Sequence, residues 1–254
     1  MGALSGKVVA ITGATSGSGL GIARRFAAEG SELVLLARGQ ERLDEVAASL
    51  GNRSIPVSTD VGDPDSVRRA FALIADRFGR LDVLINNAAI YKPCLVEHLT
   101  DVEIQRQIAT NLAGPIYTSR AAIPLLRAAG GGDIVNTSSE STLHPFPMLA
   151  IYVATKAALE SFAGVLADEV RDDDIRVTTV IQGATNIGGS DSTDWHIEPA
   201  AFETAMALWG ERGLLLQAQG RYGGQDVDDI GDVHLFIVTR PRTQKLDVVH
   251  CRSC

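Results

Sequence analysis

The chain is short of cysteine, aromatic residues and basic charge, and each shortage narrows the classes of protein to which it can belong. Three of its 254 residues are cysteines, an odd number that needs no disulfide in a reducing compartment. Aromatic residues make up 5% and glycines number 25, so we expect an aliphatic core with many tight turns. The net charge of −8 argues against a general affinity for nucleic acid or for an anionic membrane.

Long hydrophobic runs are also missing. No run of roughly 18 apolar residues is present, and the N-terminus has no charged segment followed by an apolar one. We therefore expect no membrane-spanning helix, no signal peptide and a cytoplasmic location. The last two cysteines form Cys251-Arg-Ser-Cys254. Without a second such pair they are weak grounds for zinc or redox chemistry, so we expect a solvated tail and no metal site.

Apolar runs of strand length alternate with helical patterns along the chain. The long helical region from about 100 to 129 contains Pro115 and Pro124, so we expect it to be kinked or divided there. This alternation predicts one α/β domain over residues 1–254, a Rossmann-type doubly wound sheet of about seven parallel strands with helices on both faces. The less regular residues 184–224 are expected to supply substrate-binding loops and helices. The expected strands span residues 7–12, 32–37, 54–59, 81–85, 133–137, 175–181 and 245–249.

A glycine-rich turn joins the first expected strand to the first helix. It reads Thr12-Gly13-Ala-Thr-Ser-Gly17-Ser-Gly19. Glycines let the backbone approach a pyrophosphate, and a helix N-terminus supplies N–H donors and the positive end of the helix dipole. The strand–turn–helix context therefore predicts a dinucleotide site.

Tyr152 and Lys156 lie four residues apart on an expected helix, so they share one face. A phenol with an ordinary pKa near ~10 is a poor acid or base at neutral pH, and a neighbouring cation lowers that pKa. Ser139 adds a hydroxyl that can hold a substrate oxygen. Such a set suits proton transfer to or from a carbonyl or an alcohol, although the Tyr–Lys pair alone is common on helix surfaces.

Together these motifs resemble the short-chain dehydrogenase/reductase family. The resemblance rests on the order and spacing of five elements and covers about residues 5–250. It implies a single Rossmann-type domain that uses NAD(H) or NADP(H) to interconvert alcohols and carbonyls. The five elements are Gly13-x-x-x-Gly17-x-Gly19, Asn86-Asn87-Ala88, Asn111, Ser139 and Tyr152-x-x-x-Lys156.

The resemblance implies a role for each matching residue. Tyr152 would be the general acid/base, and Lys156 would lower its pKa and hold the nicotinamide ribose. Ser139 would orient the substrate oxygen, and Asn111 would support a water-linked proton relay to Lys156. As alternatives, Asn111 is a helix-kink residue and Asn87 ties strand ends together. Cofactor contacts are implied for Gly13, Thr15, Ser16, Gly17, Ser18, Gly19, Asp60, Val61, Asn87, Ala88, Tyr152, Lys156, Gly183 and Thr185.

The choice between the two cofactors depends on Arg38. A carboxylate at the end of the second strand would accept hydrogen bonds from the ribose 2′-hydroxyl and repel a 2′-phosphate. This strand ends Leu36-Ala37-Arg38, and a guanidinium suits a phosphate by charge and geometry. We therefore expect NADP(H), with NAD(H) as the alternative; Ser16 offers no second basic group in the glycine-rich turn.

Four positions depart from the family pattern. Ser18 places a hydroxyl where Ile or Leu is usual, and Ala89 replaces a glycine. Gln182 replaces the proline of a Pro-Gly pair, and Ile187 stands where a Thr holds the nicotinamide carboxamide, although Thr185 could substitute. We expect cofactor binding to survive and the detailed fit of the nicotinamide to differ.

The substrate pocket is expected between Ser139 and Tyr152 and after Gly183. Its candidates are mostly apolar, which suits a hydrophobic carbonyl or alcohol substrate. The resemblance also implies a homodimer or homotetramer. Two other functions stay open, a non-catalytic nucleotide sensor and an epimerase or dehydratase on the same fold. The pocket candidates besides Ser139 and Tyr152 are His144, Phe146, Trp195, Met148, Tyr91, Cys94 and Phe202.

Overall fold

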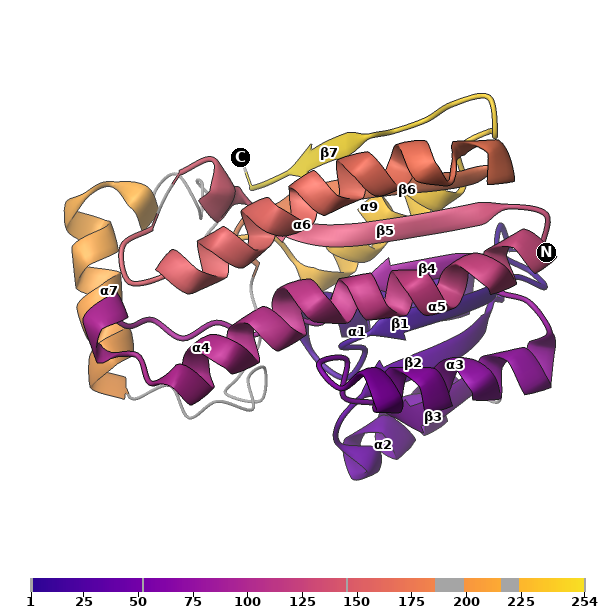
Figure 1. Cartoon of the computed structure of the whole chain (residues 1–254), viewed down its shortest axis with the longest axis horizontal. Helices are drawn as coiled ribbons and strands as arrows, with labels where there is room; N and C mark the ends of the chain where they lie inside the picture. Colours follow the sequence, from indigo (N-terminus) through magenta and orange to yellow (C-terminus); the bar gives the residue numbers. More distant parts are fainter. Residues whose placement is uncertain (1, 52, 145, 186–198, 216–223, 254) are drawn as a thin grey trace.

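All seven strands lie in one parallel sheet, in the order β3-β2-β1-β4-β5-β6-β7 (Figure 1). The computed structural model describes residues 2–51, 53–144, 146–185, 199–215 and 224–253. The predicted fold class is thereby confirmed. The strands are β1 (Val8–Thr12), β2 (Glu32–Ala37), β3 (Ser54–Ser58), β4 (Val83–Asn86), β5 (Gly132–Ser139), β6 (Ile175–Gln182) and β7 (Val248–Cys251).

Helices cover both faces of the sheet (Figure 1). One hydrophobic cluster joins α1, α2 and α9 to one face, and a second joins α3, α5 and α6 to the other. One end of the molecule is formed by α7 (Figure 1). The α-helices described are α1 (Gly17–Ala28), α2 (Gln40–Leu50), α3 (Pro64–Phe78), α4 (Asp101–Ile108), α5 (Gly114–Ala128), α6 (Ala150–Glu169), α7 (Pro199–Glu211) and α9 (Val227–Val238).

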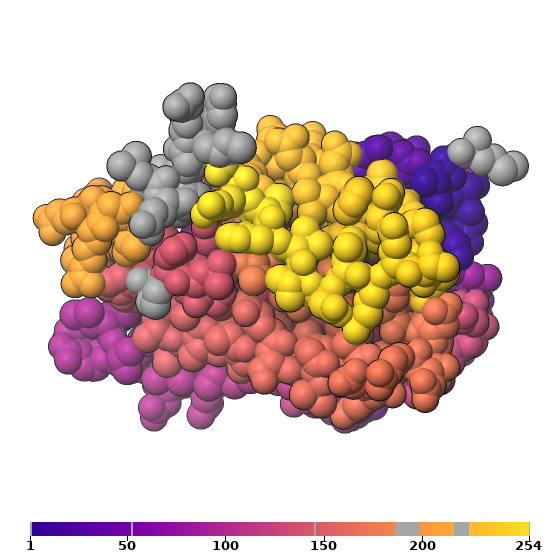
Figure 2. Space-filling view, turned by 90° about the horizontal axis from the view of Figure 1, so that it is seen from above, coloured from indigo at the N-terminus to yellow at the C-terminus, as the bar shows by residue number. Residues whose placement is uncertain are grey.

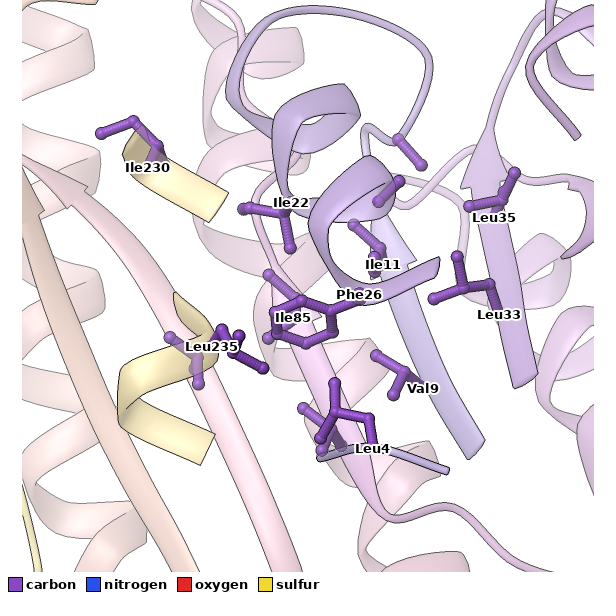
Figure 3. Close-up of a cluster of buried hydrophobic side chains, with 14 of the residues drawn as sticks. Leu4, Val9, Ile11, Ile22, Phe26, Leu33, Leu35, Ile85, Ile230 and Leu235 are labelled. Atoms are coloured by element: carbon purple, nitrogen blue, oxygen red, sulfur yellow. The ribbon is translucent and has the colours of Figure 1, made fainter. Parts of the chain in front are cut away.

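Side chains of β1 alternate between the two cores because successive residues of a strand point to opposite faces. Val9 and Ile11 pack with Phe26 of α1, whereas Val8 and Ala10 belong to the opposite cluster. Figure 3 shows Phe26 lying against the sheet among side chains of α1, β1 and β4. Its side chain is fully buried, which stabilises the fold by about 1.5–3 kcal/mol relative to exposure. Both faces of β1 are buried, so its first four residues are apolar and only Thr12, at its end, is polar.

The long helical region is irregular at Asn111, not at its prolines. A π-helical turn, Ala109–Ala113, joins α4 to α5. Pro115 lies in the first turn of α5, where a missing N–H costs little, and Pro124 lies inside that helix. The region is therefore in two pieces, the second beginning next to Pro115 as one expectation held, while the expected break at Pro124 is wrong; the single extra residue of the π turn redirects Asn111.

The C-terminal strand begins and ends later than expected. Cys251 is the last residue of β7, half-buried, and pairs in register with Gln182. Its thiol donates a hydrogen bond to Gln225 Oε1 at 2.6 Å. The expectation of a solvated tail is therefore wrong for Cys251, while Cys254 lies outside the described residues. Figure 2 shows the yellow C-terminal segment as part of the molecular surface.

Among the described helices, α6 is long and apolar enough to cross a membrane by length and composition. The sequence analysis, which expected no such helix, missed this property. In the structure α6 contacts β5 and β6 and buries Leu159, Ala163 and Leu166. Core helices that cover a parallel sheet pass the same test, so the property is weak grounds for a membrane span.

The amino ends of β5 and β6 are joined by a buried ion pair. The Arg176 guanidinium donates to both carboxylate oxygens of Asp133, at 2.7 and 3.1 Å. Its third nitrogen donates to the backbone carbonyls of Arg240, Pro241 and Gln244 at 3.0–3.1 Å. Arg176 thus fastens the segment between α9 and β7 to the sheet, with all three guanidinium nitrogens hydrogen-bonded.

Replacing this guanidinium should be costly. Arg176→Ala leaves Asp133 buried without its main partner and frees three carbonyls, so we expect the free energy of unfolding to fall by about 3–5 kcal/mol. Urea denaturation measures the change. The control is Arg127→Ala, which removes an exposed pair with Asp173 at 2.6 Å and should cost less than about 1 kcal/mol. Equal losses in both variants would contradict the assignment.

Candidate functional site

The strand order reverses between β1 and β4, and a cleft of about 930 Å³ opens where their carboxyl ends part. Ligands of open parallel sheets bind at this kind of position. Of the residues predicted to form the site, eighteen line the cleft. These are Gly13, Thr15, Ser16, Gly17, Ser18, Arg38, Asp60, Val61, Asn87, Ala88, Tyr91, Ser139, Phe146, Tyr152, Lys156, Gly183, Thr185 and Phe202.

The remaining predictions have other outcomes. Gly19 and Asn111 lie behind the cleft wall and support it. His144 is not part of the wall, and its backbone N–H donates to the Glu140 carbonyl at 3.1 Å. Trp195 lies outside the described residues, so its role stays a prediction.

The glycine-rich turn is held together by close backbone contact. Gly13 has a φ of +67°, in the region that favours glycine, and follows β1 directly. A Cβ atom on Gly19 would lie 2.1 Å from the Gly13 carbonyl oxygen. Only glycine at position 19 therefore lets α1 start this close to β1. The N-terminus of α1, whose N-cap residue Ser16 makes no side-chain cap hydrogen bond, consequently faces the cleft.

Thr12 fastens the two strands on either side of the reversal. Its hydroxyl oxygen accepts from the backbone N–H groups of Asn87 and Ala88 at 2.9 and 3.0 Å, and its proton goes to the Ile85 carbonyl at 3.3 Å. The Asn87 side-chain amide donates to the Thr12 carbonyl at 3.2 Å. Asn87 therefore ties strand ends together, as the alternative interpretation held, and it lines the cleft as well.

Lys156 sits beneath the ring of Tyr152 on α6, as their spacing predicts. Its Nζ atom lies 5.7 Å from the ring centroid and donates to the Thr137 carbonyl at 2.6 Å. The lysine side chain is almost completely buried. The carbonyl of Thr137, in β5, thus holds the Lys156 ammonium in place near the phenol of Tyr152.

Burial shifts both pKa values in the directions that favour neutral groups. It raises the pKa of Tyr152 to about 12, and the nearby Tyr91 adds to this, whereas a hydrogen bond with Ser139 lowers it. Burial also lowers the pKa of Lys156 to about 8, partly opposed by the Glu160 carboxylate. Burial is the largest influence on the pKa of Tyr152, and the expectation that Lys156 lowers that pKa stays a prediction.

Ser139 is oriented by Ser141, a residue that the sequence did not single out. The Ser141 backbone N–H and hydroxyl both donate to Ser139 Oγ, at 3.2 and 3.0 Å. A hydroxyl has two acceptor positions and one proton. With both acceptor positions used, the Ser139 proton is left to donate toward Tyr152 or a substrate oxygen.

The Asn111 side chain is committed to the backbone of Ile90. Its Oδ1 accepts from the Ile90 N–H and its Nδ2 donates to the Ile90 carbonyl, both at 2.8 Å. Nδ2 also donates to Thr155 Oγ1 at 3.2 Å. Asn111 thus fixes the segment that follows β4, and the water-linked relay to Lys156 stays a prediction.

Two of the departures from the family pattern are hydrogen-bonded to each other. Gln182 Nε2 donates to Ser18 Oγ at 2.8 Å and to Thr185 Oγ1 at 2.7 Å. The amide therefore bridges the start of α1 and the segment after β6, two parts that would otherwise face each other across the cleft. No local sequence signal links positions 18 and 182.

Arg42 is a second cation of the cleft that the sequence analysis missed. It lies in the first turns of α2 and lines the cleft together with Arg38 and Gly39. Its guanidinium also pairs with Glu45 at 2.8 Å. The sequence signal for Arg42 was its place four residues after Arg38, at the start of the following helix. The sequence analysis looked for a second basic group in the glycine-rich turn alone.

The wall opposite the turn is apolar. Phe146 meets Trp209 of α7 edge to face, with ring centroids 5.3 Å apart. The Trp209 indole N–H donates to the Pro147 carbonyl at 2.8 Å, which fixes the ring. Leu149 and Met206 extend this wall. The helical pattern after residue 200 was the available signal for Trp209 and Met206.

The cleft suits a dinucleotide. The turn between Gly13 and Gly19 leaves backbone room for a pyrophosphate, and Asp60, Val61 and Lys156 line the same cleft. No group of three His, Cys, Asp or Glu residues that could hold a metal occurs in the described parts of the chain.

Comparisons with known proteins agree with this geometry. A family model described as short chain dehydrogenase matches residues 7–195. Oxidoreductase asL5 of Sarocladium schorii is 32% identical over 241 residues, which are 93% of this chain and 90% of that protein. The 11-beta-hydroxysteroid dehydrogenase 1A of Arabidopsis thaliana is 40% identical over 185 residues, 71% of this chain and 52% of that protein.

Solved structures show the same fold with bound cofactors. L-sorbose reductase of Gluconobacter frateurii, complexed with NADPH and L-sorbose, has a TM-score of 0.83 at 30% identity and covers 99% of this chain and 96% of its own. A metagenomic short-chain oxidoreductase in complex with NADP has a TM-score of 0.79 at 27% identity and covers 98% and 97%.

The contact at Gly19 yields a test of the turn. Gly19→Ala places a methyl group against the Gly13 carbonyl, so α1 must move and NADPH affinity should fall at least about tenfold, with a stability loss of about 1–3 kcal/mol. Gly164→Ala is the control, since this exposed glycine of α6 has nothing within 4 Å of an added Cβ. That variant should gain up to about 1 kcal/mol. Fluorescence titration with NADPH and thermal unfolding measure both; an unchanged affinity in Gly19→Ala would contradict this view of the turn.

Proposed function

The chain belongs to the short-chain dehydrogenase family and is an NAD(P)-dependent oxidoreductase; we propose that it interconverts a secondary alcohol and a ketone, or an alcohol and an aldehyde, with NADP(H). The observation that carries the proposal is the meeting of Ser139, Tyr152 and Lys156 on the wall of the cleft that the glycine-rich turn opens. A protein that only senses nucleotides has no need of a buried phenol beside an oriented serine, so the enzyme is favoured over the sensor. An epimerase or dehydratase is the second alternative, and no contact of the site favours it.

Tyr152 is the proton donor in the direction of carbonyl reduction. Because burial holds its pKa at about 12, the phenol is protonated throughout the neutral range and can give its proton to the carbonyl oxygen. Ser139, whose acceptor positions are filled by Ser141, donates a hydrogen bond to the same oxygen. The Lys156 ammonium stabilises the phenolate that remains. When bound, the nicotinamide supplies or accepts the hydride at the substrate carbon.

The preference for NADP(H) is supported by two guanidinium groups at one end of the cleft. Arg38 follows β2 and Arg42 lies one helical turn further on, and both line the cleft where a ribose 2′-phosphate would lie. Arginine forms charge-assisted bonds with phosphate oxygens in fixed geometry. Asp60, the acidic residue of this wall, has its Oδ1 occupied by the Gly62 N–H at 2.9 Å.

The apolar wall of Phe146, Leu149, Met206 and Trp209 favours a substrate with a hydrophobic body. The related L-sorbose reductase was solved with a sugar, so the family scaffold also admits polar ketones. Assembly as a homodimer or homotetramer and the cytoplasmic location stay predictions.

The cofactor preference can be tested by binding alone. Arg38→Asp and Arg42→Ala should each weaken NADPH by about 10- to 100-fold, since charge-assisted hydrogen bonds are lost, and should change NADH affinity by less than about threefold. Arg69→Ala is the control, because this exposed arginine lies on α3, away from the cleft. It removes the same charge from the chain as Arg42→Ala does. Equal losses for the two cofactors in Arg38→Asp would refute the NADP(H) assignment.

The chemical role of Tyr152 can be tested by turnover. Tyr152→Phe keeps the ring and removes the acid, so ketone reduction should slow by roughly 10²–10⁴-fold while NADPH affinity stays within about threefold. In the wild type, reduction should decline as the pH rises through about 8, where Lys156 loses its charge. Steady-state rates between pH 6 and about 10 provide the profile. Undiminished turnover in Tyr152→Phe would end this mechanism.

A further inference from the structure

Tyr91 stands beside the catalytic tyrosine although no step of the mechanism uses it. It lies five residues after β4 ends and lines the cleft. Its ring meets the Tyr152 ring edge to face, with centroids 5.8 Å apart and planes inclined by 64°. The same ring packs with Leu149 and Trp209 in the apolar wall. A phenol is thus built into that wall next to the reacting position.

The backbone before Tyr91 is unusually firmly held. The Asn111 side chain, which belongs to the π turn, hydrogen-bonds both the backbone N–H and the carbonyl of Ile90 at 2.8 Å. Ile90 itself is buried. A residue adjacent to such a clamp has little freedom to turn its ring away. Holding an active-site side chain this tightly is the arrangement expected for a group that contacts a ligand.

The Tyr91 hydroxyl makes no hydrogen bond to any residue that the structure describes. The same phenol is mostly desolvated, and burial raises its pKa, so it remains a neutral donor at every working pH. Buried tyrosines usually find a partner for their hydroxyl. Tyr91 lines the cleft, so a molecule bound in the cleft is the available hydrogen-bond partner for its hydroxyl.

We propose that the Tyr91 hydroxyl is a second hydrogen-bond donor to the substrate and that it recognises an oxygen on the carbon next to the reacting carbonyl. The two ring centroids lie 5.8 Å apart, so one small molecule can contact both tyrosines, and two neighbouring oxygens on it would give each hydroxyl an acceptor. The substrate class is a ketone with a neighbouring hydroxyl or keto oxygen on a mostly apolar body. This inference rests on the proposed carbonyl reduction, in which Tyr152 takes the first oxygen.

Benzoin and deoxybenzoin test the proposal, because they differ only by a hydroxyl next to the carbonyl. Isothermal titration calorimetry gives their dissociation constants for the wild type and for Tyr91→Phe. The wild type should bind benzoin about tenfold more tightly, and Tyr91→Phe should abolish that ratio while leaving deoxybenzoin within about twofold. Tyr117→Phe is the matched control, since Tyr117 lies on α5 outside the cleft, and it should keep the ratio.

Reduction of both ketones by NADPH, followed alongside, separates the two proposals. A ratio that survives in Tyr91→Phe, no preference for benzoin in the wild type, or no binding of either ketone would overturn the role of Tyr91, whatever the turnover. If the ratio of the two dissociation constants is lost in Tyr91→Phe but the wild type reduces neither ketone, the role of Tyr91 would be supported and the proposed function contradicted.

Discussion

The hydroxyl of Thr12 holds together the place on which the cleft depends. Where strand order reverses, the segments leaving β1 and β4 diverge to opposite faces of the sheet, and nothing in the regular ladder joins them beyond that point. Thr12 bonds three backbone groups of the β4 end, and Asn87 returns a fourth bond. Since Gly13 follows Thr12 directly, the phosphate turn and the segment leading to Tyr91 are anchored at one side chain.

Desolvation then decides the chemistry of the proton-transfer group. Tyr152 and Lys156 are neighbours, and in water the ammonium of such a pair would lower the pKa of the phenol. In this cleft both charged forms are disfavoured, so the pKa of Tyr152 rises to about 12 and the pKa of Lys156 falls to about 8. The phenol therefore stays protonated at neutral pH, which is the form that the reduction of a carbonyl would need. Oxidation requires a phenolate, and higher pH favours it.

Much of this arrangement could be predicted from local sequence. Apolar periodicity located the first six strands, and Asp63 before Pro64 marked the start of α3, where its carboxylate accepts the N–H groups of Asp65 and Ser66. The spacing of Tyr152 and Lys156 placed both on one face of α6. These features depend on residues within one or two turns of each other, where backbone geometry alone determines the outcome.

What escaped prediction depends on contacts between distant segments. Gln182 hydrogen-bonds Ser18, which lies 164 positions earlier in the chain. The bounds of β7 are set by its register with β6 rather than by its own composition. The pKa of Tyr152 follows from how much protein surrounds it, which no spacing reveals. The two departures at positions 18 and 182 are intelligible only together, since each supplies the partner that the other needs.

The π turn joins catalysis to specificity. In a regular α-helix Asn111 would point elsewhere; the extra residue of Ala109–Ala113 turns its amide onto Ile90. Its remaining donor goes to Thr155, which in turn donates to the Tyr152 carbonyl at 2.7 Å. One amide thus supports both tyrosines, Tyr152 through α6 and Tyr91 through Ile90. Their relative placement is therefore set by the fold.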